Sequence, residues 1–457
     1  MRTLLVALAL ALAAFAQSPA IALTHVNVID GTGGPERADR TIVIANGKVT
    51  AYGPAEAVQP PAGAAVEDLR GDTVYPGLVG MHEHMFYPAG GNTYNEQAFS
   101  FPRLYLAAGV TTMRTTGAVE PYTDLDIKQA IDAGRMPGPN IIPTGPYLEG
   151  FPSIGPQLHS LKNAAEARRF VRYWASVGDN NWKAYMHITR AELAAAIATA
   201  HAMHQKITGH LCSIGFREAA AMGIDDLEHG FVIDTEFVPG KKPDQCHNQA
   251  VTFATNARLS ISSPEVQRTI HTLIADHVAL TSTLPVFETF VPNRPPLQPR
   301  VLDVLSPDAR VNYLRFRVRI AAGAARSPWP RLFPKEMEFE RDFYNDGGLL
   351  LAGLDPTGGG GVVAGFGDER ELELLVEAGF TPEQAIKIYT LNGATYLGIA
   401  NRVGTIAVGK QADLVVVRGD PGRRIADVEH VLTVYKAGRA YNSARLIASV
   451  RGQVGMH

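Results

Sequence analysis

Short apolar runs and longer helical segments alternate along most of the chain. The runs AGVTTMRTTG (108–117) and KITGHLC (206–212) have the length and β-branched content of buried strands. The segment RAELAAAIATAHAMHQK (190–206) has the composition of a helix. Such alternation is typical of βα units on a parallel sheet, and a region of about 330 residues suits a (β/α)₈ barrel with insertions. We therefore predict an α/β fold with a TIM-like barrel over residues 75–403.

Both ends of the chain have a different pattern, which indicates antiparallel strands. In IVIANGKVTAYG (42–53) apolar residues alternate around Asn46-Gly47, a dipeptide typical of two-residue hairpins. The segments GTIAVGKQADLVVV (404–417) and VEHVLTVYKAGRAY (428–441) are similarly rich in strand-forming residues and turns. Residues 17–74 and 404–457 are therefore expected to lie outside the barrel.

Residues 290–345 interrupt the alternation and are rich in proline, arginine and aromatic residues. They separate two candidate strands, TSTLPVF (281–287) and GGLLLAGLD (347–355). A long insertion at this position is typical of a lid or a substrate-contacting cap, and it could also contact another copy in a homo-oligomer. Its arginines offer forked donors suited to a substrate carboxylate: Arg294, Arg300, Arg315, Arg317 and Arg319.

Composition limits the possible partners and the location of the protein. The 457 residues are 46% hydrophobic and carry a net charge of −3, which gives no reason to expect nucleic acid or a membrane surface as partner. The start of the chain combines Arg2, the apolar stretch Leu4–Phe15 and the small-x-small pattern Ala14-Phe15-Ala16. This predicts a signal peptide over residues 1–16, a mature start at Gln17 and a periplasmic or secreted protein without a membrane anchor. Whether Cys212 and Cys246 pair is left open by the sequence.

Candidate chemistry gathers where the predicted barrel strands end, which is where barrel enzymes hold their active sites. His82 and His84, in VYPGLVGMHEHMFYP (74–88), lie on one face of a strand because side chains alternate there. The remaining candidates follow other strands: Lys183, Tyr185, His210, His229 and Asp355. Neutral imidazoles suit Zn²⁺, a carboxylate completes such a site, and a deprotonated lysine can add carbon dioxide to form a bridging carbamate. Tyr185 shares a face with Lys183 and is a candidate for contacting the substrate.

The ordered motifs resemble the amidohydrolase superfamily, in particular its imidazolonepropionase-like proteins and metal-dependent Xaa-Pro dipeptidases (prolidases). The resemblance implies a barrel flanked by a small β-sandwich built from both termini. It also implies two divalent metal ions, zinc by preference: His82, His84 and Asp355 would hold one, His210 and His229 the other. Carboxylated Lys183 would bridge them, and Asp355 would act as general base and acid toward a bridging hydroxide. The resemblance rests on these segments: VYPGLVGMHEH, AGVTTMRTTG, WKAY, GIDDLEHG, LLLAGLD, ELELLVEAGFTPEQAIKIYTLNGATYLG and VGTIAVGKQADLVVV.

Two departures from the family pattern affect the substrate rather than the metal site. Similar proteins often have Arg-Asp where this chain has Arg114-Thr115. The loop TGPYLEGFPSIGPQLHS (144–160) lacks the Gly-Gly-His expected in the peptidase branch, so His159 is a candidate replacement.

Three functions follow as hypotheses. The first is an exported binuclear hydrolase of C–N amide bonds in a small-molecule substrate, either a dipeptide (Xaa-Pro or Xaa-apolar) or an N-acyl amino acid. The second is a mononuclear hydrolase or deaminase of cyclic amides or imidazolones. The third is a non-catalytic barrel that serves as a solute-binding or scaffold protein, which the complete ligand set argues against because buried ligands are destabilising without metal.

Overall fold

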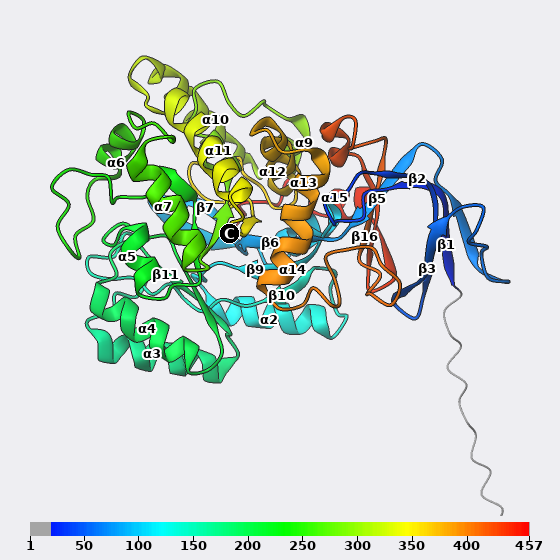
Figure 1. The fold of residues 1–457 in the computed structure, drawn as a ribbon, viewed down its shortest axis with the longest axis horizontal. Helices are drawn as coiled ribbons and strands as arrows, with labels where there is room; N and C mark the ends of the chain where they lie inside the picture. The colour runs from blue at the N-terminus through cyan, green and yellow to red at the C-terminus, as the bar shows by residue number, and fades with distance from the viewer. Residues whose placement is uncertain (1–19, 457) are drawn as a thin grey trace, which may run out of the picture.

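The computed structural model describes residues 20–456, so the predicted signal peptide (residues 1–16) and the mature start at Gln17 lie outside the described residues. The two ends of the chain meet in one eight-stranded mixed sheet, drawn in blue and red side by side at the right of Figure 1. The strand order is β18-β17-β16-β5-β1-β2-β3, with β4 paired to β1. Strands from both ends of the chain thus share one hydrogen-bonded sheet. The strands are β1 (Ile21–Val28), β2 (Arg37–Ala45), β3 (Lys48–Pro54), β4 (Ala65–Asp68), β5 (Asp72–Pro76), β16 (Leu414–Arg418), β17 (Val431–Lys436) and β18 (Arg439–Asn442).

Two parallel sheets form the centre of the larger part of the protein, which is therefore a mixed α/β fold. One sheet has the order β10-β9-β6 and the other β11-β12-β13-β14-β15. Nearly every residue of these strands is buried, as expected for strands covered on both faces. Their bounds are β6 (Leu78–Glu83), β9 (Val110–Thr115), β10 (Asn140–Ile142), β11 (Asn181–Ala184), β12 (Lys206–Gly209), β13 (Asp226–Glu228), β14 (Ala279–Ser282) and β15 (Leu350–Ala352).

Backbone hydrogen bonds connect the two parallel sheets at both of their edges. On one side Gly145 N donates to Asn181 O (3.0 Å), and on the other Asp355 N donates to His82 O (3.1 Å). The second contact requires Gly353, because a Cβ atom there would lie 2.4 Å from His82 N. Glycine thus allows β15 to approach β6 closely enough to bring Asp355 beside His82.

Helices surround the parallel strands, as Figure 1 shows. Several begin as their sequences predict: Thr381 caps its helix in a capping box with Gln384, and Thr189 does the same with Glu192. The helices are α1 (Ser100–Ala107), α2 (Pro121–Asp132), α3 (Ala164–Val177), α4 (Arg190–His201), α5 (Phe216–Ala221), α6 (Gln249–Asn256), α7 (Pro264–Ala275), α8 (Leu284–Glu288), α9 (Pro299–Val304), α10 (Pro307–Ala322), α11 (Trp329–Asn345), α12 (Phe366–Glu377), α13 (Pro382–Lys387), α14 (Gly393–Tyr396) and α15 (Ser443–Ala448).

Local predictions hold at one turn and fail at one strand. The Asn46-Gly47 hairpin is confirmed: both residues have positive φ (52° and 76°) between the antiparallel strands β2 and β3. The prediction of a strand over 281–287 is wrong beyond Ser282, because Leu284–Glu288 forms α8 with Pro285 in its first turn. A small hairpin of β7 (Phe86–Gly90) and β8 (Thr93–Glu96) was not predicted.

The insertion of residues 290–345 contains α9, α10 and α11. In Figure 1 these helices lie together above the parallel strands. Phe316 and Tyr313 of α10 pack against the glycines of the 358–361 loop, since a Cβ atom at Gly359 would lie 2.3 Å from Phe316. The insertion therefore supports a loop at the strand ends from behind. None of the helices in the described residues is long and apolar enough to span a membrane.

Candidate metal centre

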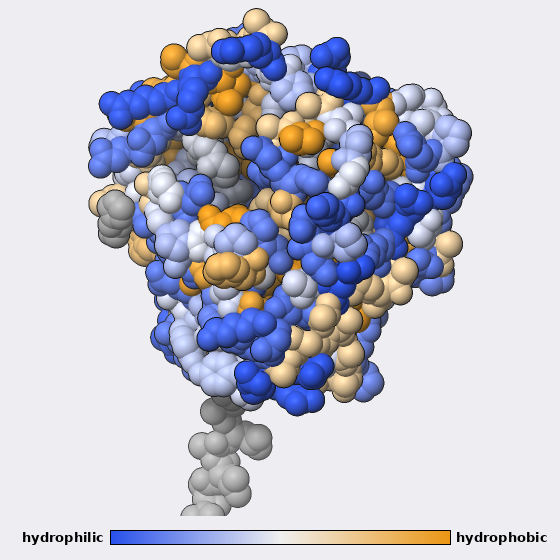
Figure 2. Space-filling view, turned by 90° about the vertical axis from the view of Figure 1, so that its left-hand side faces the viewer, coloured by the Kyte–Doolittle hydropathy of each residue, from blue (hydrophilic) through white to orange (hydrophobic). Residues whose placement is uncertain are grey.

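All seven site residues predicted from the sequence line a single cavity of about 420 Å³. They come from different elements: His82 lies in β6 and Lys183 in β11. The residues that directly follow a strand are His84 (β6), Tyr185 (β11), His210 (β12) and His229 (β13), and Asp355 lies three residues after β15. The side of the molecule that faces the viewer in Figure 2 is hollowed, with hydrophobic and hydrophilic residues around the hollow. The structure thus brings together His82, His84, Lys183, Tyr185, His210, His229 and Asp355.

Three imidazoles are held by their Nδ1 atoms. His82 Nδ1 donates to Glu228 Oε2 (2.6 Å), His84 Nδ1 donates to the backbone oxygen of Gly117 (3.1 Å), and His229 Nδ1 is hydrogen-bonded to the Thr283 hydroxyl (2.7 Å). This fixes each ring and leaves Nε2 free. Metal-binding histidines in proteins are held in the same way.

The three free Nε2 atoms surround the carboxylate of Asp355. They lie 3.7 Å (His82), 3.6 Å (His84) and 3.8 Å (His229) from its oxygens, too far for hydrogen bonds. Ligand atoms bound about 2.0–2.2 Å from one tetrahedral zinc ion lie roughly 3.3–3.5 Å apart, so this spacing suits a shared metal ion. Asp355 Oδ1 is buried without a hydrogen-bond partner, which is costly unless a ligand occupies the site. We conclude that these residues fit a metal ion.

His210 extends this group on its far side. The ring centroids of His84, His82, His229 and His210 form a row with successive separations of 5.2, 4.6 and 4.5 Å. The tightest group of candidate ligands is His82, His229 and Asp355. This group combines residues that the resemblance assigns to different metal ions, His82 to the first and His229 to the second. In the row, His84 lies next to His82 at one end, and His210 lies next to His229 at the other.

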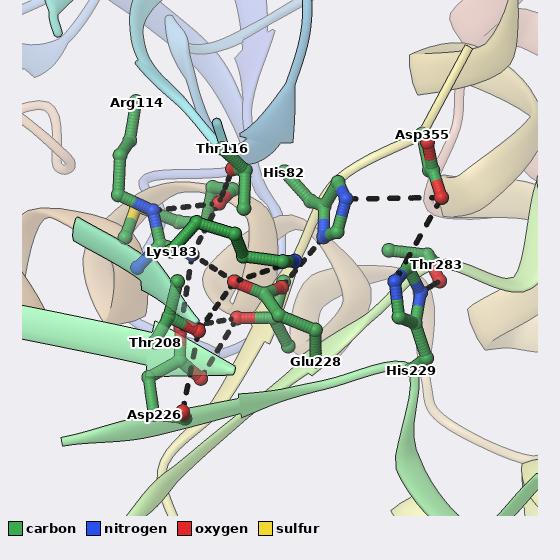
Figure 3. Close-up of polar contacts among 12 residues, drawn as sticks. His82, Arg114, Thr116, Lys183, Thr208, Asp226, Glu228, His229, Thr283 and Asp355 are labelled. Carbon is green, nitrogen blue, oxygen red and sulfur yellow. Dashed lines mark hydrogen bonds and ion pairs between the residues drawn. The ribbon is translucent and has the colours of Figure 1, made fainter. Parts of the chain in front are cut away.

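The side chain of Lys183 extends toward Glu228 (Figure 3). Its Nζ is buried, lies 3.8 Å from Glu228 Oε1 and has no hydrogen-bond partner among the described residues. Burial lowers the pKa of Lys183 to about 8, and the Glu228 carboxylate opposes this shift. A lysine with such a pKa has a substantial neutral fraction near neutral pH, which carbamate formation requires.

The surroundings also keep the imidazoles neutral. Burial and the positive charge of Lys183 lower the pKa of His84 and of His210 to about 3 and hold the pKa of His82 and His229 well below the usual value. Burial raises the pKa of Asp355 to about 6. Neutral imidazoles beside one carboxylate are the protonation states that zinc requires.

A buried ion-pair network beneath the site was missed in the sequence. Arg114 donates to Glu228 Oε1 (2.8 Å) and to the backbone oxygen of Met81 (2.9 Å), and it pairs with Asp226 (2.9 Å); Thr208 also donates to Glu228. Figure 3 shows Glu228 between Arg114, Lys183 and His82. The available signal was a pair of acidic residues, Asp226 and Glu228, within a short buried strand, where charges occur only with partners.

The prediction that arginines of the insertion contact the substrate is wrong. The five arginines of the insertion do not line the cavity: Arg294 pairs with Glu288 and Glu377, and Arg300 with Glu369 and Glu429. Arg317 donates to the Pro295 backbone and Tyr313, Arg319 packs over Phe316, and Arg315 is exposed. Arg294 and Arg300 are thus neutralised by glutamates outside the cavity, and most of these glutamates lie far from the two arginines in the sequence.

His159 does not enter the cavity and therefore does not replace the missing histidine. Its Nε2 lies 3.0 Å from Glu166 Oε1, and its ring stacks on Phe170. The same loop instead contributes Tyr147 to the cavity lining. Glu149 of this loop does not line the cavity, but its carboxylate accepts a hydrogen bond from the backbone N–H of the lining residue His187 (2.8 Å).

A disulfide bond holds one wall of the cavity. Cys212, two residues after His210, is bonded to Cys246, and the lining residues Cys246, His247 and Gln249 follow one another closely. The question that the sequence left open is answered: the two cysteines pair. The bond ties the loop before α6 to the end of β12.

Glu228 is expected to control metal affinity through His82. Glu228→Gln keeps the size of the side chain but weakens the bond that orients His82, so zinc affinity should fall about 10–100-fold. Asp226→Asn is the matched control, because Asp226 pairs with Arg114 without contacting a histidine. Competition titration with a chelator measures both; equal losses in the two variants would assign the effect to Arg114 rather than to His82.

The lowered pKa of His84 predicts an acid-dependent stability difference in the metal-free protein. An unfolded imidazole binds a proton near pH 6.5, whereas folded His84 binds one only near pH 3, so folding stability is lost as pH falls between these values. His84→Asn removes this loss. Relative to the variant, the wild type should lose up to about 1.4 kcal/mol of unfolding free energy per pH unit below 6.5. Denaturant titrations from pH 8 to pH 5 measure it, and a pH-independent difference would contradict the assignment.

Comparison with known proteins agrees with this geometry. Residues 344–441 match the model of the Amidohydrolase family. Allantoinase of Streptomyces avermitilis is 42% identical over 72 residues, a stretch that spans only 16% of this chain and 16% of that protein.

Solved structures match over nearly the whole chain. A protein from Bifidobacterium longum assigned as a prolidase is 25% identical with a TM-score of 0.67, covering 94% of this chain and 99% of the other. A Xaa-Pro dipeptidase solved with methionine in its active site is 20% identical with a TM-score of 0.69, covering 93% and 100%. Residues 344–441 thus resemble the Amidohydrolase family, and the fold as a whole resembles these solved structures, in agreement with a site whose residues fit a metal ion.

Proposed function

We propose that this protein hydrolyses C–N amide bonds in small substrates with the help of two divalent metal ions, zinc by preference. The observation that carries the proposal is the convergence of neutral imidazoles on Asp355 beside Lys183, whose buried Nζ has no hydrogen-bond partner in residues 20–456. A non-catalytic role is disfavoured, because such a set of buried polar atoms costs free energy unless ligands satisfy it.

His82, His84 and Asp355 would hold one ion, and His210 and His229 the other, with carboxylated Lys183 between them. The order of the histidine row supports this division, since His84 and His210 lie at its two ends. Metal ions in such a site supply a nucleophilic water at neutral pH and polarise the carbonyl of the substrate.

The proton transfers fall to Asp355. Its carboxylate lies at the centre of the site, where it would accept a proton from the attacking water and then return it to the leaving nitrogen. An amide nitrogen leaves poorly unless it is protonated, so the second transfer is as necessary as the first. Tyr185, whose ring centroid lies 5.1 Å from that of His210, is placed to contact the substrate.

The proposed substrates are dipeptides (Xaa-Pro or Xaa-apolar) or N-acyl amino acids. Resemblance to solved dipeptidases and a cavity large enough for such molecules support this choice. Because no arginine is found among the described residues that line the cavity, a substrate carboxylate would be bound by other side-chain donors of the lining: Asn92, Tyr94, Gln157, His187, His247 and Gln249.

A mononuclear hydrolase of cyclic amides is the second candidate. The observation that favours it is the tight group of His82, His229 and Asp355, whose ligand atoms lie within 4.8 Å of one another and suit a single ion. Metal content of the purified protein separates the two candidates, at two ions or one ion per chain.

We also propose that residues 75–403 form a closed (β/α)₈ barrel. The backbone hydrogen bonds that join the two parallel sheets at both edges support closure. Residues 17–74 and 404–457 would form the small β-sandwich domain of the family.

We also propose export, which the Cys212–Cys246 disulfide supports because such bonds persist in oxidising compartments. Protein isolated from its native source should begin at Gln17, which intact-mass spectrometry measures. Protein that retains Met1 would contradict export.

Lys183→Ala tests the bridge between the ions. The variant should lose one of two bound metals and at least about 100-fold in kcat, because the bridging anion is gone. Acetate or propionate should restore part of the activity by occupying the gap. Lys206→Ala, on the neighbouring strand, is the control, since Lys206 contacts Tyr396 and not the site. A Lys183→Ala protein with two metals and full turnover would exclude the bridge.

Asp355→Asn tests the reaction itself. The amide cannot carry the proton, so kcat should fall about 10²–10⁴-fold while much of the bound metal is retained. The assay uses the metal-loaded protein against a library of dipeptides, N-acyl amino acids and cyclic amides. Turnover of cyclic amides alone would replace the leading proposal with the second candidate.

A further inference from the structure

One side of the cavity is a wall of phenylalanine rings that the metal site does not use. Phe253 of α6, Phe287 of α8 and Phe290, which follows α8, all line the cavity. Their ring centroids lie 5.0, 5.5 and 5.2 Å from that of Trp329 on α11, and the Phe287 and Phe290 rings stack on the indole. Residues far apart in the sequence therefore form one aromatic surface.

This wall is firmly supported and lies beside the reacting centre. Trp329 is 6% exposed and does not itself line the cavity, so it holds the three rings from behind. Phe287 contacts His229 edge to face, at 5.5 Å between centroids. A group bound against the phenylalanines would thus lie next to a metal ligand.

Another part of the cavity lining has different chemistry. Tyr147 and Tyr185 pack together at 4.6 Å between centroids, and Tyr147 lies 6.2 Å from His84. Their hydroxyl groups offer hydrogen bonds there, whereas the phenylalanine wall offers none. A substrate that suits both parts has one polar end and one apolar end.

We propose that Phe253, Phe287 and Phe290 form an aryl-binding subsite, so that the preferred substrates are amides carrying a flat aromatic group rather than a proline ring. Phe253 and Phe290 are only half-buried, and the apolar surface they present to the cavity is removed from water when an aromatic ring stacks on it. A proline ring is smaller and has no π face to stack. This inference rests on the proposed amide hydrolysis and specifies its substrate class.

Paired substrates test the subsite on either side of the scissile bond. N-benzoylglycine and N-acetyl-L-phenylalanine carry the aryl group on opposite sides, and N-acetylglycine and glycyl-L-proline lack it. At least one aryl substrate should exceed both non-aryl substrates tenfold or more in kcat/KM. In Phe290→Leu and in Phe253→Leu this preference should fall at least fivefold, mainly through KM.

Phe237→Leu is the matched control, because Phe237 is also half-buried but packs against Phe231 and does not line the cavity. It should keep the wild-type preference. Thermal melts verify that each variant is folded, and two half-buried wall residues, Phe253 and Phe290, give independent variants.

A binding measurement separates this inference from the proposed reaction. Benzamide should raise the melting temperature of the metal-loaded wild type and of Phe237→Leu, and less so that of Phe290→Leu and Phe253→Leu; acetamide should not. Benzamide binding that depends on the wall, without hydrolysis of any amide, would support the subsite and overturn the proposed reaction. Hydrolysis with no aryl preference, or a preference unchanged in both wall variants, would overturn the subsite and leave the reaction standing.

Discussion

The site depends on imidazoles that are buried, neutral and fixed by their Nδ1 atoms. A buried ring needs partners for both nitrogens, and the protein provides one partner for each of His82, His84 and His229. The second nitrogen is left facing Asp355. Because Glu228, Gly117 and Thr283 belong to different segments, the direction of each ligand is set by the register of the parallel strands rather than by its own strand alone.

Glu228 connects the scaffold with this site. It neutralises Arg114, holds His82 and lies near Lys183, all without access to solvent. Without its carboxylate, Arg114 would keep only Asp226 as a counter-ion, and a buried charge that loses a partner is strongly destabilising. The same carboxylate therefore contributes to folding, through Arg114, and to the position of a candidate metal ligand, through His82.

The cavity above the site distributes its chemistry unevenly. Arg294 and Arg300 of the insertion pair with glutamates outside the cavity, whereas aromatic residues of the insertion form or support its walls. The proposed recognition of a substrate therefore rests on polar side chains without a guanidinium group and on phenyl rings. This arrangement changes the expected recognition of a substrate from charge pairing to shape, stacking and hydrogen bonding, which are less sensitive to salt.

The sequence by itself determined the alternation of strands and helices, the Asn46-Gly47 turn, the Thr381 cap and the positions of the candidate ligands at strand ends. These features depend on local periodicity and turn chemistry, which short segments encode. Only the tertiary structure decided which partner each residue finds. His82 and Glu228 are 146 positions apart, Arg114 and Glu228 114, and the phenylalanine wall requires α6, α8 and α11 to meet. Such pairings depend on how distant elements pack, and local patterns of hydrophobic and polar residues carry no information about that choice.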